Sequence, residues 1–329
     1  MSAAQWYCKL QDGGSVEAMY QLAKCFEDGS GGVGEDEEKA FELYKAAAEA
    51  NHTEAMYKVG MKFMEEEEWD DGMGWLTQCA DRYHPLAMYR VGMAYMEGEG
   101  VLEDEEEAFP WIERAATAGV PEAEYELGNC YLHGLGEPQD SSKAFEWFRK
   151  AANHGSIPAK YEVGRSLLQG RGVEEDAAAA AAILLEGAVQ GHSGCMLLVG
   201  HCYARGKGVA INYAESLKWY SAAAQEGHDE AQFQLGVIYE RGIGTSKDVP
   251  QAIEWYRKAA ESNHAAALLA LGRHFTDPSK PFSFNQQGFQ YIQQAAEEGN
   301  AEAMFRLGLA YSAGIGTAKD LAAAFTNFE

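Results

Sequence analysis

The chain has 329 residues, and 47% of them are hydrophobic, so it can bury a core or build an extended array. Its 51 acidic residues outnumber its 26 basic residues and give a formal net charge of −25. This balance excludes nucleic acid and anionic membrane surfaces as partners, because both would be repelled. The first 122 residues carry 27 of the acidic and 9 of the basic residues. We interpret this acidic surface as an aid to solubility, with docking of a basic partner as the alternative.

The start of the chain, Met1–Trp6, has neither the basic residues nor the apolar stretch of a secretion signal. No apolar run approaches the roughly 20 residues that a membrane span needs. The six cysteines form no Cys-x-x-Cys pair and have no zinc spacing. We therefore expect a cytoplasmic protein with reduced thiols.

From residue 18 onward one pattern recurs nine times, and each copy opens on a small residue, at Ala18, Ala55, Ala87, Ala123, Ala159, Cys195, Ala231, Ala267 and Ala303. Counting this residue as position 0, position 2 is aromatic or leucine, position 4 is leucine or valine, and position 8 is mostly tyrosine or phenylalanine. Large residues four apart share one face of a helix. Position 5 is glycine in all copies but the first. A glycine inside a helix costs about 1 kcal/mol relative to alanine, so we expect close approach of a second helix there.

A Gly-x-Gly sequence such as Gly134-Leu-Gly136 then ends the first helix of most copies. A second helix is predicted to begin after an N-cap residue at position 17, which is Asp104, Asp140, Asp176, Asn212, Asp248 or Asp320. We expect buried aromatic residues in this helix at Trp111, Trp147, Trp219 and Trp255. Each copy is thus a pair of antiparallel helices, which can bury its apolar face only by stacking on its neighbours.

The fourth copy carries the complete motif, with Ala123, Tyr125, Leu127-Gly128, Tyr131, Gly134, Gly136, Asp140, Lys143-Ala144, Trp147-Phe148, Lys150-Ala151-Ala152 and Gly155. This pattern resembles the Sel-one-like repeat (SLR) family, whose members are related to tetratricopeptide repeats. The resemblance implies an all-α fold, an α/α superhelical solenoid of antiparallel helix pairs. Residues 18–329 would form nine repeats, the last incomplete, and residues 1–17 would form a capping helix. The second copy, with Glu65–Glu68 in its turn, and the eighth, with Pro278, Pro281 and Phe284, depart from the motif.

Histidine and cysteine recur in the repeats and are the residue types that could carry chemistry. His52, His84, His192, His228 and His264 each follow the end of a second helix. Because they recur in phase, one repeat apart, we predict a structural role rather than a metal site. Cys25, Cys130 and Cys202 share position 7 and are expected to pack in the core. No catalytic set, metal site or cofactor site is predicted, and the chain is expected not to be an enzyme.

The resemblance also implies an adaptor or scaffold role, with the first helices lining a concave groove. By analogy with tetratricopeptide repeats, positions 2, 6, 9 and 10 should point inward. The predicted partner-binding residues are Met61, Met64, Met93, Met96, His133, Arg165, His201, Arg205, Arg241 and Arg273. Methionine suits adaptable apolar contacts, and an arginine series suits an acidic or phosphorylated protein segment. The alternative for the methionines is packing between helices, whereas the arginines are expected to be exposed.

The function predicted from the sequence is therefore a non-catalytic protein–protein interaction scaffold. One alternative is a structural spacer or regulatory module of a larger multidomain protein. The other is a hydrolase of the cysteine-rich SLR type, which is disfavoured because Cys79 is the only cysteine in a second helix.

Overall fold

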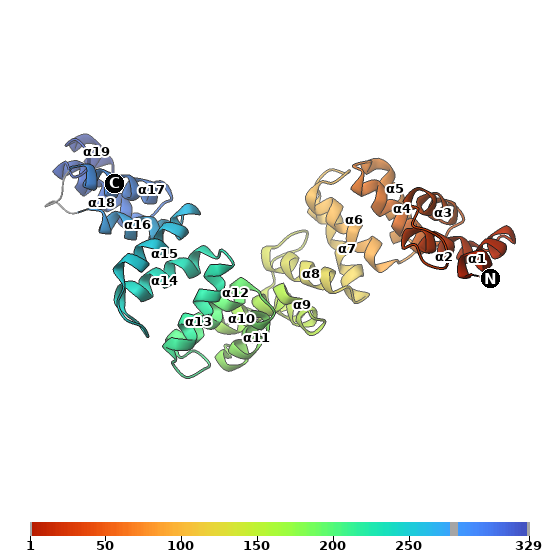
Figure 1. The fold of residues 1–329 in the computed structure, drawn as a ribbon, viewed down its shortest axis with the longest axis horizontal. Coiled ribbons are helices and arrows are strands. Elements are labelled where there is room, and N and C mark those ends of the chain that lie inside the picture. The colour runs from red at the N-terminus through yellow and green to blue at the C-terminus, as the bar shows by residue number, and fades with distance from the viewer. Residues whose placement is uncertain (1, 277–281, 328–329) are drawn as a thin grey trace. The chain divides into compact units, whose positions relative to one another are not determined.

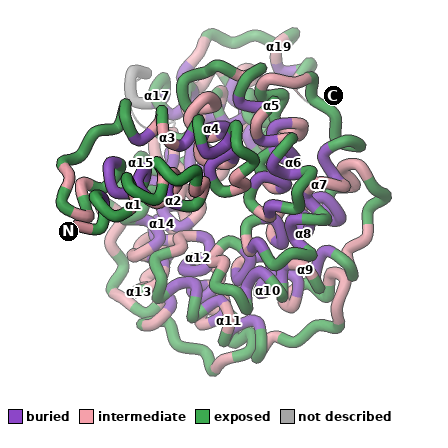
Figure 2. Tube along the Cα trace, turned by 90° about the vertical axis from the view of Figure 1, so that its right-hand side faces the viewer, coloured by how far each residue is buried: buried purple, intermediate pink, exposed green. Residues whose placement is uncertain are grey.

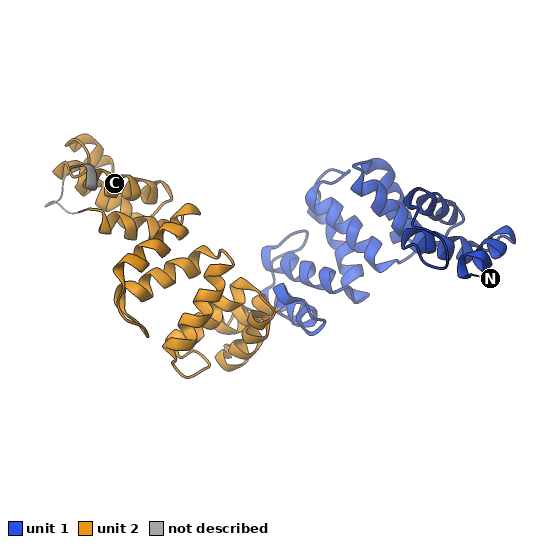
Figure 3. Ribbon diagram, viewed as in Figure 1, with its two compact units in different colours: residues 1–159, 171–173 blue, residues 160–170, 174–329 orange. Residues whose placement is uncertain are grey.

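The structure, a computed structural model, describes residues 2–276 and 282–327, and the side chains of the second range from residue 285 onward. Every regular element in these ranges is an α-helix (Figure 1). The chain forms two compact units, and the main boundary between them falls within one helix (Figure 3). Unit 1 contains residues 1–159 and 171–173, and unit 2 contains residues 160–170 and 174–329. The all-helical prediction is confirmed.

The helices of unit 1 are α1 (Ala3–Asp12), α2 (Val16–Glu27), α3 (Glu37–Glu49), α4 (Thr53–Glu65), α5 (Trp69–Ala80), α6 (Pro85–Glu97), α7 (Glu105–Thr117), α8 (Pro121–His133) and α9 (Ser141–Asn153). Helix α10 (Ile157–Gln169) begins in unit 1 and lies mostly in unit 2. The remaining helices of unit 2 are α11 (Ala177–Val189), α12 (Ser193–Arg205), α13 (Tyr213–Gln225), α14 (Asp229–Arg241), α15 (Val249–Glu261), α16 (Ala265–His274), α17 (Phe282–Glu297), α18 (Ala301–Ala313) and α19 (Leu321–Thr326).

Repeats 1 to 9 correspond to consecutive helix pairs, from α2 and α3 to α18 and α19. Within unit 1, each helix from α1 to α9 packs against the next one along the chain. The same holds in unit 2 from α11 to α19. Buried residues follow the helices, and the connecting loops are largely exposed (Figure 2). Each unit therefore has a core that runs on from repeat to repeat, as stacked hairpins require.

The predicted N-caps of the second helices are confirmed. The side chains of Asp104, Asp140, Asp176, Asn212, Asp248 and Asp320 all accept hydrogen bonds from backbone N–H groups in the first turn of their helices. The first glycine of the Gly-x-Gly turn, as at Gly134 with φ 78°, ends the first helix in the left-handed region. The second glycine has a further role: a Cβ atom on Gly136 would collide with the backbone carbonyl of Glu105 in the preceding repeat.

The glycine at position 5 makes the close approach that the sequence predicts. A Cβ atom on Gly128 would lie 2.5 Å from the ring of Phe148, and one on Gly92 would lie 2.6 Å from Ile112. Both partners belong to the second helix of the same repeat. We call this site the second-helix core position; it is occupied by Tyr44, Leu76, Ile112, Phe148, Leu184, Tyr220, Tyr256 and Ile292.

The prediction of buried tryptophans is wrong in detail. Trp111, Trp147, Trp219 and Trp255 are half-buried, and the residue that follows each of them is the buried one. The indole rings of Trp111, Trp147 and Trp255 each contact a cation three residues further on, as Trp147 does with the ammonium group of Lys150 at 3.5 Å. The ring of Trp219 contacts the preceding residue, Lys218. Such stacking leaves the charged group in water while the ring covers the helix surface.

The second copy forms a regular hairpin despite its missing glycines. Helix α4 ends at Glu65 and α5 begins at Trp69, and Glu67 takes the left-handed conformation with φ 60°. Pro278 and Pro281 of the eighth copy, and the side chain of Phe284, lie outside the described residues. At the other end of the chain, α1 packs on α2, and the N–H of Ala4 donates to the carbonyl of Gly31 at 3.2 Å. A capping role for residues 1–17 stays a prediction.

Candidate partner-binding site: the first-helix hollows

Four surface hollows lie at equivalent places between consecutive repeats. Each is lined by position 9 and the second-helix core position of one repeat, and by positions 3 and 6 of the next. We name each hollow by the two repeats that form it. The 1–2 hollow (about 390 Å³) and the 2–3 hollow (about 130 Å³) belong to unit 1. The 6–7 hollow (about 510 Å³) and the 8–9 hollow (about 350 Å³) belong to unit 2.

The 1–2 hollow contains an acid, Glu27, that is held by two donors. The hydroxyl of Tyr44 donates to Glu27 Oε2 at 2.7 Å, and the ammonium group of Lys58 donates to Glu27 Oε1 at 2.8 Å. Burial raises the pKa of Glu27, but the bonds from Lys58 and Tyr44 outweigh it, so the net shift is downward. Glu27 is therefore a fixed negative charge in this hollow.

The 2–3 hollow is lined by methionine. Met61, Met64 and Met93 converge there, together with the guanidinium-bearing side chain of Arg90. All three methionines are half-buried, so their thioethers are partly accessible. This arrangement suits an apolar side chain of a partner, because methionine adapts to irregular shapes.

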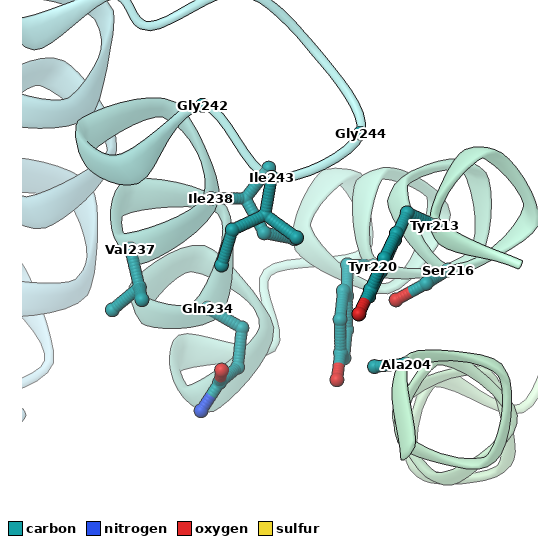
Figure 4. Close-up of a pocket in the computed structure, with 10 residues that line it drawn as sticks. All are labelled: Ala204, Tyr213, Ser216, Tyr220, Gln234, Val237, Ile238, Gly242, Ile243 and Gly244. Carbon is teal, nitrogen blue, oxygen red and sulfur yellow. The ribbon is translucent and has the colours of Figure 1, made fainter. Parts of the chain in front are cut away.

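The 6–7 hollow brings together residues from three helices (Figure 4). Helix α12 contributes Ala204, α13 contributes Tyr213, Ser216 and Tyr220, and α14 contributes Gln234 and Val237. The side chains of Tyr213 and Tyr220 point the same way in this view, with their hydroxyls toward Ala204 (Figure 4). The hollow therefore combines apolar walls with hydroxyl and amide groups, a combination typical of binding sites.

The 8–9 hollow carries two cations. Arg273 and Arg306 both line it, beside the apolar side chains of Leu309 and Ile292. Arg306 is held by Glu302, with its Nη2 atom 2.8 Å from Oε1. Arg273 is exposed and has no carboxylate partner among the described residues.

Three of the four predicted methionines thus line a hollow, and Met96 is half-buried at the same repeat position as Met64. Arg205 and Arg241 are exposed, and neither has a carboxylate partner in the described part of the chain. His133 is also exposed. These residues are accessible, as a binding role requires.

Arg165 differs from the prediction that it would be exposed. Its side chain is only 28% exposed, and its guanidinium pairs with Glu162 at 2.7 Å, one helical turn earlier. His201 is also half-buried, with its ring 5.4 Å from that of Tyr220. Burial and the nearby charge of Arg205 lower the pKa of His201. Arg165 is therefore a poor candidate for binding an acidic segment.

The recurring histidines have the predicted structural role. The Nδ1 atoms of His52, His84, His192 and His264 each accept the backbone N–H three residues further on and cap the helix that follows. Most of these rings make two more contacts. His264, for example, places Nε2 3.0 Å from Glu230 and stacks on Phe233, both in the preceding repeat. His228 occupies the same place at α14 without a side-chain cap bond.

Among the described residues, no group of three or more His, Cys, Asp or Glu side chains is placed to hold a metal ion. Burial raises the pKa of Glu126, and the nearby charge of Glu97 adds to this effect, but Asn129 donates a hydrogen bond that opposes it. Within the described ranges, no helix is both long and apolar enough to cross a membrane.

Comparison with known proteins identifies the repeat. The family model of the Sel1 repeat matches residues 16–52, 85–120, 121–156, 157–192, 193–228, 229–264, 285–300 and 301–329, which is more than half of the chain. The chain belongs to the Sel1 repeat family. Proteins with Sel1 repeats generally mediate protein–protein interactions. The model does not match residues 53–84, and it matches only the end of the eighth repeat, the two copies whose turns depart from the motif.

Two solved structures share this Sel1 repeat architecture. A protective antigen of uropathogenic Escherichia coli with an SLR fold is 26% identical over 98% of this chain and 78% of its own, with a TM-score of 0.76. A Sel1 repeat protein from Oxalobacter formigenes is 27% identical over 87% of this chain and 84% of its own, with a TM-score of 0.71. No curated protein matches the chain.

Sequence reasoning missed two of the four positions that line each hollow. Position 3, which is Lys58, Arg90, Gln234 or Arg306, was not predicted to face inward. Its spacing from position 6 was the available signal, since residues three apart are neighbours on a helix. The second-helix core position was also missed, because the buried position of that helix was assigned to the preceding residue, the tryptophan of most copies.

Proposed function

We propose that this Sel1 repeat protein is a non-catalytic scaffold whose first-helix hollows each receive a side chain of a partner polypeptide. The observation that carries the proposal is a contrast between two sets of positions, those that build the repeat and those that line the hollows. The glycine, cap and small-residue positions are nearly constant from repeat to repeat, whereas the residues at positions 3, 6 and 9 differ between repeats in charge, polarity and size. A constant framework with variable lining is the arrangement by which solenoids present an extended recognition surface.

The two units favour different side chains. In unit 2, Arg205, Arg241 and Arg273 offer exposed guanidinium groups to an acidic or phosphorylated segment. In unit 1, the methionines of the 2–3 hollow offer a surface for apolar side chains. A cytoplasmic location, expected from the free thiols, is part of this proposal.

The proposal is tested by affinity capture with mass spectrometry, using the double variant Arg205→Glu/Arg241→Glu. Charge reversal should remove most of the proteins that the wild type captures, because like charges then face each other. A matched control, Lys247→Glu/Arg257→Glu, changes the net charge equally and alters a loop and the second helix α15. Retention of the same partners by the first variant, or their loss from the control alone, would reject the first-helix face as the binding surface.

A further inference from the structure

Wherever position 9 is glutamate, the second-helix core position of the same repeat is tyrosine. Three repeats have this tyrosine, Tyr44, Tyr220 and Tyr256, and the other repeats have leucine, isoleucine or phenylalanine there. Glutamate occurs at position 9 only in repeats 1 and 7, as Glu27 and Glu240. In both, the tyrosine hydroxyl donates to the carboxylate of its own repeat, at 2.7 Å from Tyr44 and 2.8 Å from Tyr256. This hydrogen-bonded pair joins the two helices of its own repeat.

Repeat 6 contains the tyrosine without the acid. Tyr220 is 3% exposed, but position 9 is Ala204, whose methyl group cannot accept a hydrogen bond. The Tyr220 hydroxyl shares a side-chain hydrogen bond with Ser216, whose own hydroxyl donates to the carbonyl oxygen of Gly200 at 2.9 Å. No carboxylate accepts from Tyr220 in the described part of the chain. A carboxylate would be a stronger partner for the Tyr220 hydroxyl than the neutral hydroxyl of Ser216, because a hydrogen bond to an ionised acceptor is roughly twice as strong as one between neutral groups.

The space that the acid would occupy is open. The 6–7 hollow has a volume of about 510 Å³, and the methyl group of Ala204 lines it where the longer side chain of Glu27 lines the 1–2 hollow. The next repeat supplies the same kind of wall in both: Gln234 stands where Lys58 stands, and Val237 where Met61 stands. The hollow therefore has room for a carboxylate and borders the hydroxyl that would bind it (Figure 4).

The charge beside the hollow favours an anion. Arg205 follows Ala204 directly and is exposed, and its positive charge acts on the Tyr220 hydroxyl. The acid that also acts on Tyr220 is Glu230, which is already held by His264 at 3.0 Å and by Gln234 at 2.6 Å. An incoming carboxylate would thus meet one neutral donor, the Tyr220 hydroxyl, with the positive charge of Arg205 beside the hollow rather than in its wall.

We propose that the 6–7 hollow is the receptor for an aspartate or glutamate side chain of the partner, which accepts a hydrogen bond from Tyr220 and occupies the place that Glu27 and Glu240 take in their own repeats. This inference rests on the proposed scaffold function and specifies which side chain unit 2 recognises. The partner's carboxylate completes a motif that the chain completes by itself in repeats 1 and 7.

The first test asks whether the hollow accepts a carboxylate, and it needs no partner. Ala204→Glu should rebuild the pair and raise the Tm by about 2–4 °C. The gain should disappear in Ala204→Glu/Tyr220→Phe, which lacks the donor. Ser312→Glu, at the same repeat position in α18, is the matched control and should give no such gain. A gain that persists without the Tyr220 hydroxyl, or no gain at all, overturns the inference.

The second test uses random peptides displayed on phage and selected on the wild-type protein. We expect selected peptides to share an Asp or Glu, and replacing that residue by its amide should raise Kd by about tenfold or more. Ala204→Glu should weaken binding by at least as much, because it fills the hollow with the protein's own carboxylate, and Ser312→Glu should not.

The outcomes separate the two proposals. Suppose that the selected peptides bind Arg205→Glu/Arg241→Glu weakly but bind Ala204→Glu as well as the wild type. This result would overturn the carboxylate receptor and leave the scaffold function standing. Peptides indifferent to both variants, or a selection that enriches no acidic peptide, would overturn the carboxylate receptor, and a selection that enriches no peptide at all would overturn both.

Discussion

Tyr256 on α15 donates a hydrogen bond of 2.8 Å to Glu240 on α14, and this bond joins the two helices of repeat 7. Tyr256→Phe should lower the free energy of unfolding by about 1.5–3 kcal/mol, since it leaves a partly buried carboxylate with one donor fewer. Tyr220→Phe, at the same position in repeat 6, removes a hydroxyl that has no carboxylate partner and should cost less than about 1 kcal/mol. Urea denaturation of both variants measures the difference, and equal losses would contradict the assignment.

Gly128 tests the close approach of the two helices within a repeat. Alanine would gain about 1 kcal/mol in helix propensity, but its Cβ atom would lie 2.5 Å from the ring of Phe148. We expect Gly128→Ala to destabilise the protein by about 1–3 kcal/mol. The control is Gly74→Ala in α5, where nothing lies within 4 Å, and it should stabilise by about 0.5–1 kcal/mol. Thermal unfolding that showed a gain from both changes would refute close packing at Gly128.

The methionines of α4 separate core packing from binding surface. Met56 is 2% exposed, whereas Met61 is half-buried and lines two hollows. Met56→Ala should cost about 2–5 kcal/mol of unfolding free energy, and Met61→Ala less than about 1 kcal/mol. If denaturation gives similar losses for the two, Met61 is a core residue and the alternative of packing between helices is correct.

The N-cap of α12 should make stability depend on pH. His192 accepts the N–H of Cys195 through Nδ1 at 3.2 Å, and burial together with the charge of His228 lowers its pKa below the usual 6.5, although Glu162 opposes this. The folded state favours the neutral form of His192. The contribution of this residue to the stability of the protein is therefore complete above pH 6.5 and is lost as the pH falls through the lowered pKa.

His192→Asn keeps a good cap that does not titrate. The Tm of the wild type should therefore fall further than that of the variant between about pH 8 and pH 5.5. A Tm difference between the two proteins that stays constant over this range would show that His192 does not titrate against its cap.

The sequence predicted what is local or repeats in phase. Caps such as Asp140 depend on two or three neighbouring residues, and the glycine at position 5 marked a helix contact by its recurrence. Position-by-position reading failed where burial depends on neighbouring helices. Trp147 was predicted to be buried because of its size, but the adjacent Phe148 is the residue that faces Gly128.

The hollows themselves could not be predicted from single repeats, because each is built from two. Whether Tyr220 has a partner depends on position 9 of its repeat, and the size of the opening depends also on Gln234 in the next. The pairing of Arg165 with Glu162, by contrast, was visible as an i, i+3 spacing and was overlooked.

Site-specific photo-crosslinking in cells tests the central claim, that partners bind in the first-helix hollows, most directly. A photoreactive amino acid is placed at Val237 in the 6–7 hollow, at Met93 in the 2–3 hollow, or at Leu185, which is exposed on the second helix α11. We predict crosslinked partner adducts from Val237 or Met93 and none from Leu185. Adducts from Leu185 together with none from either hollow would contradict the account.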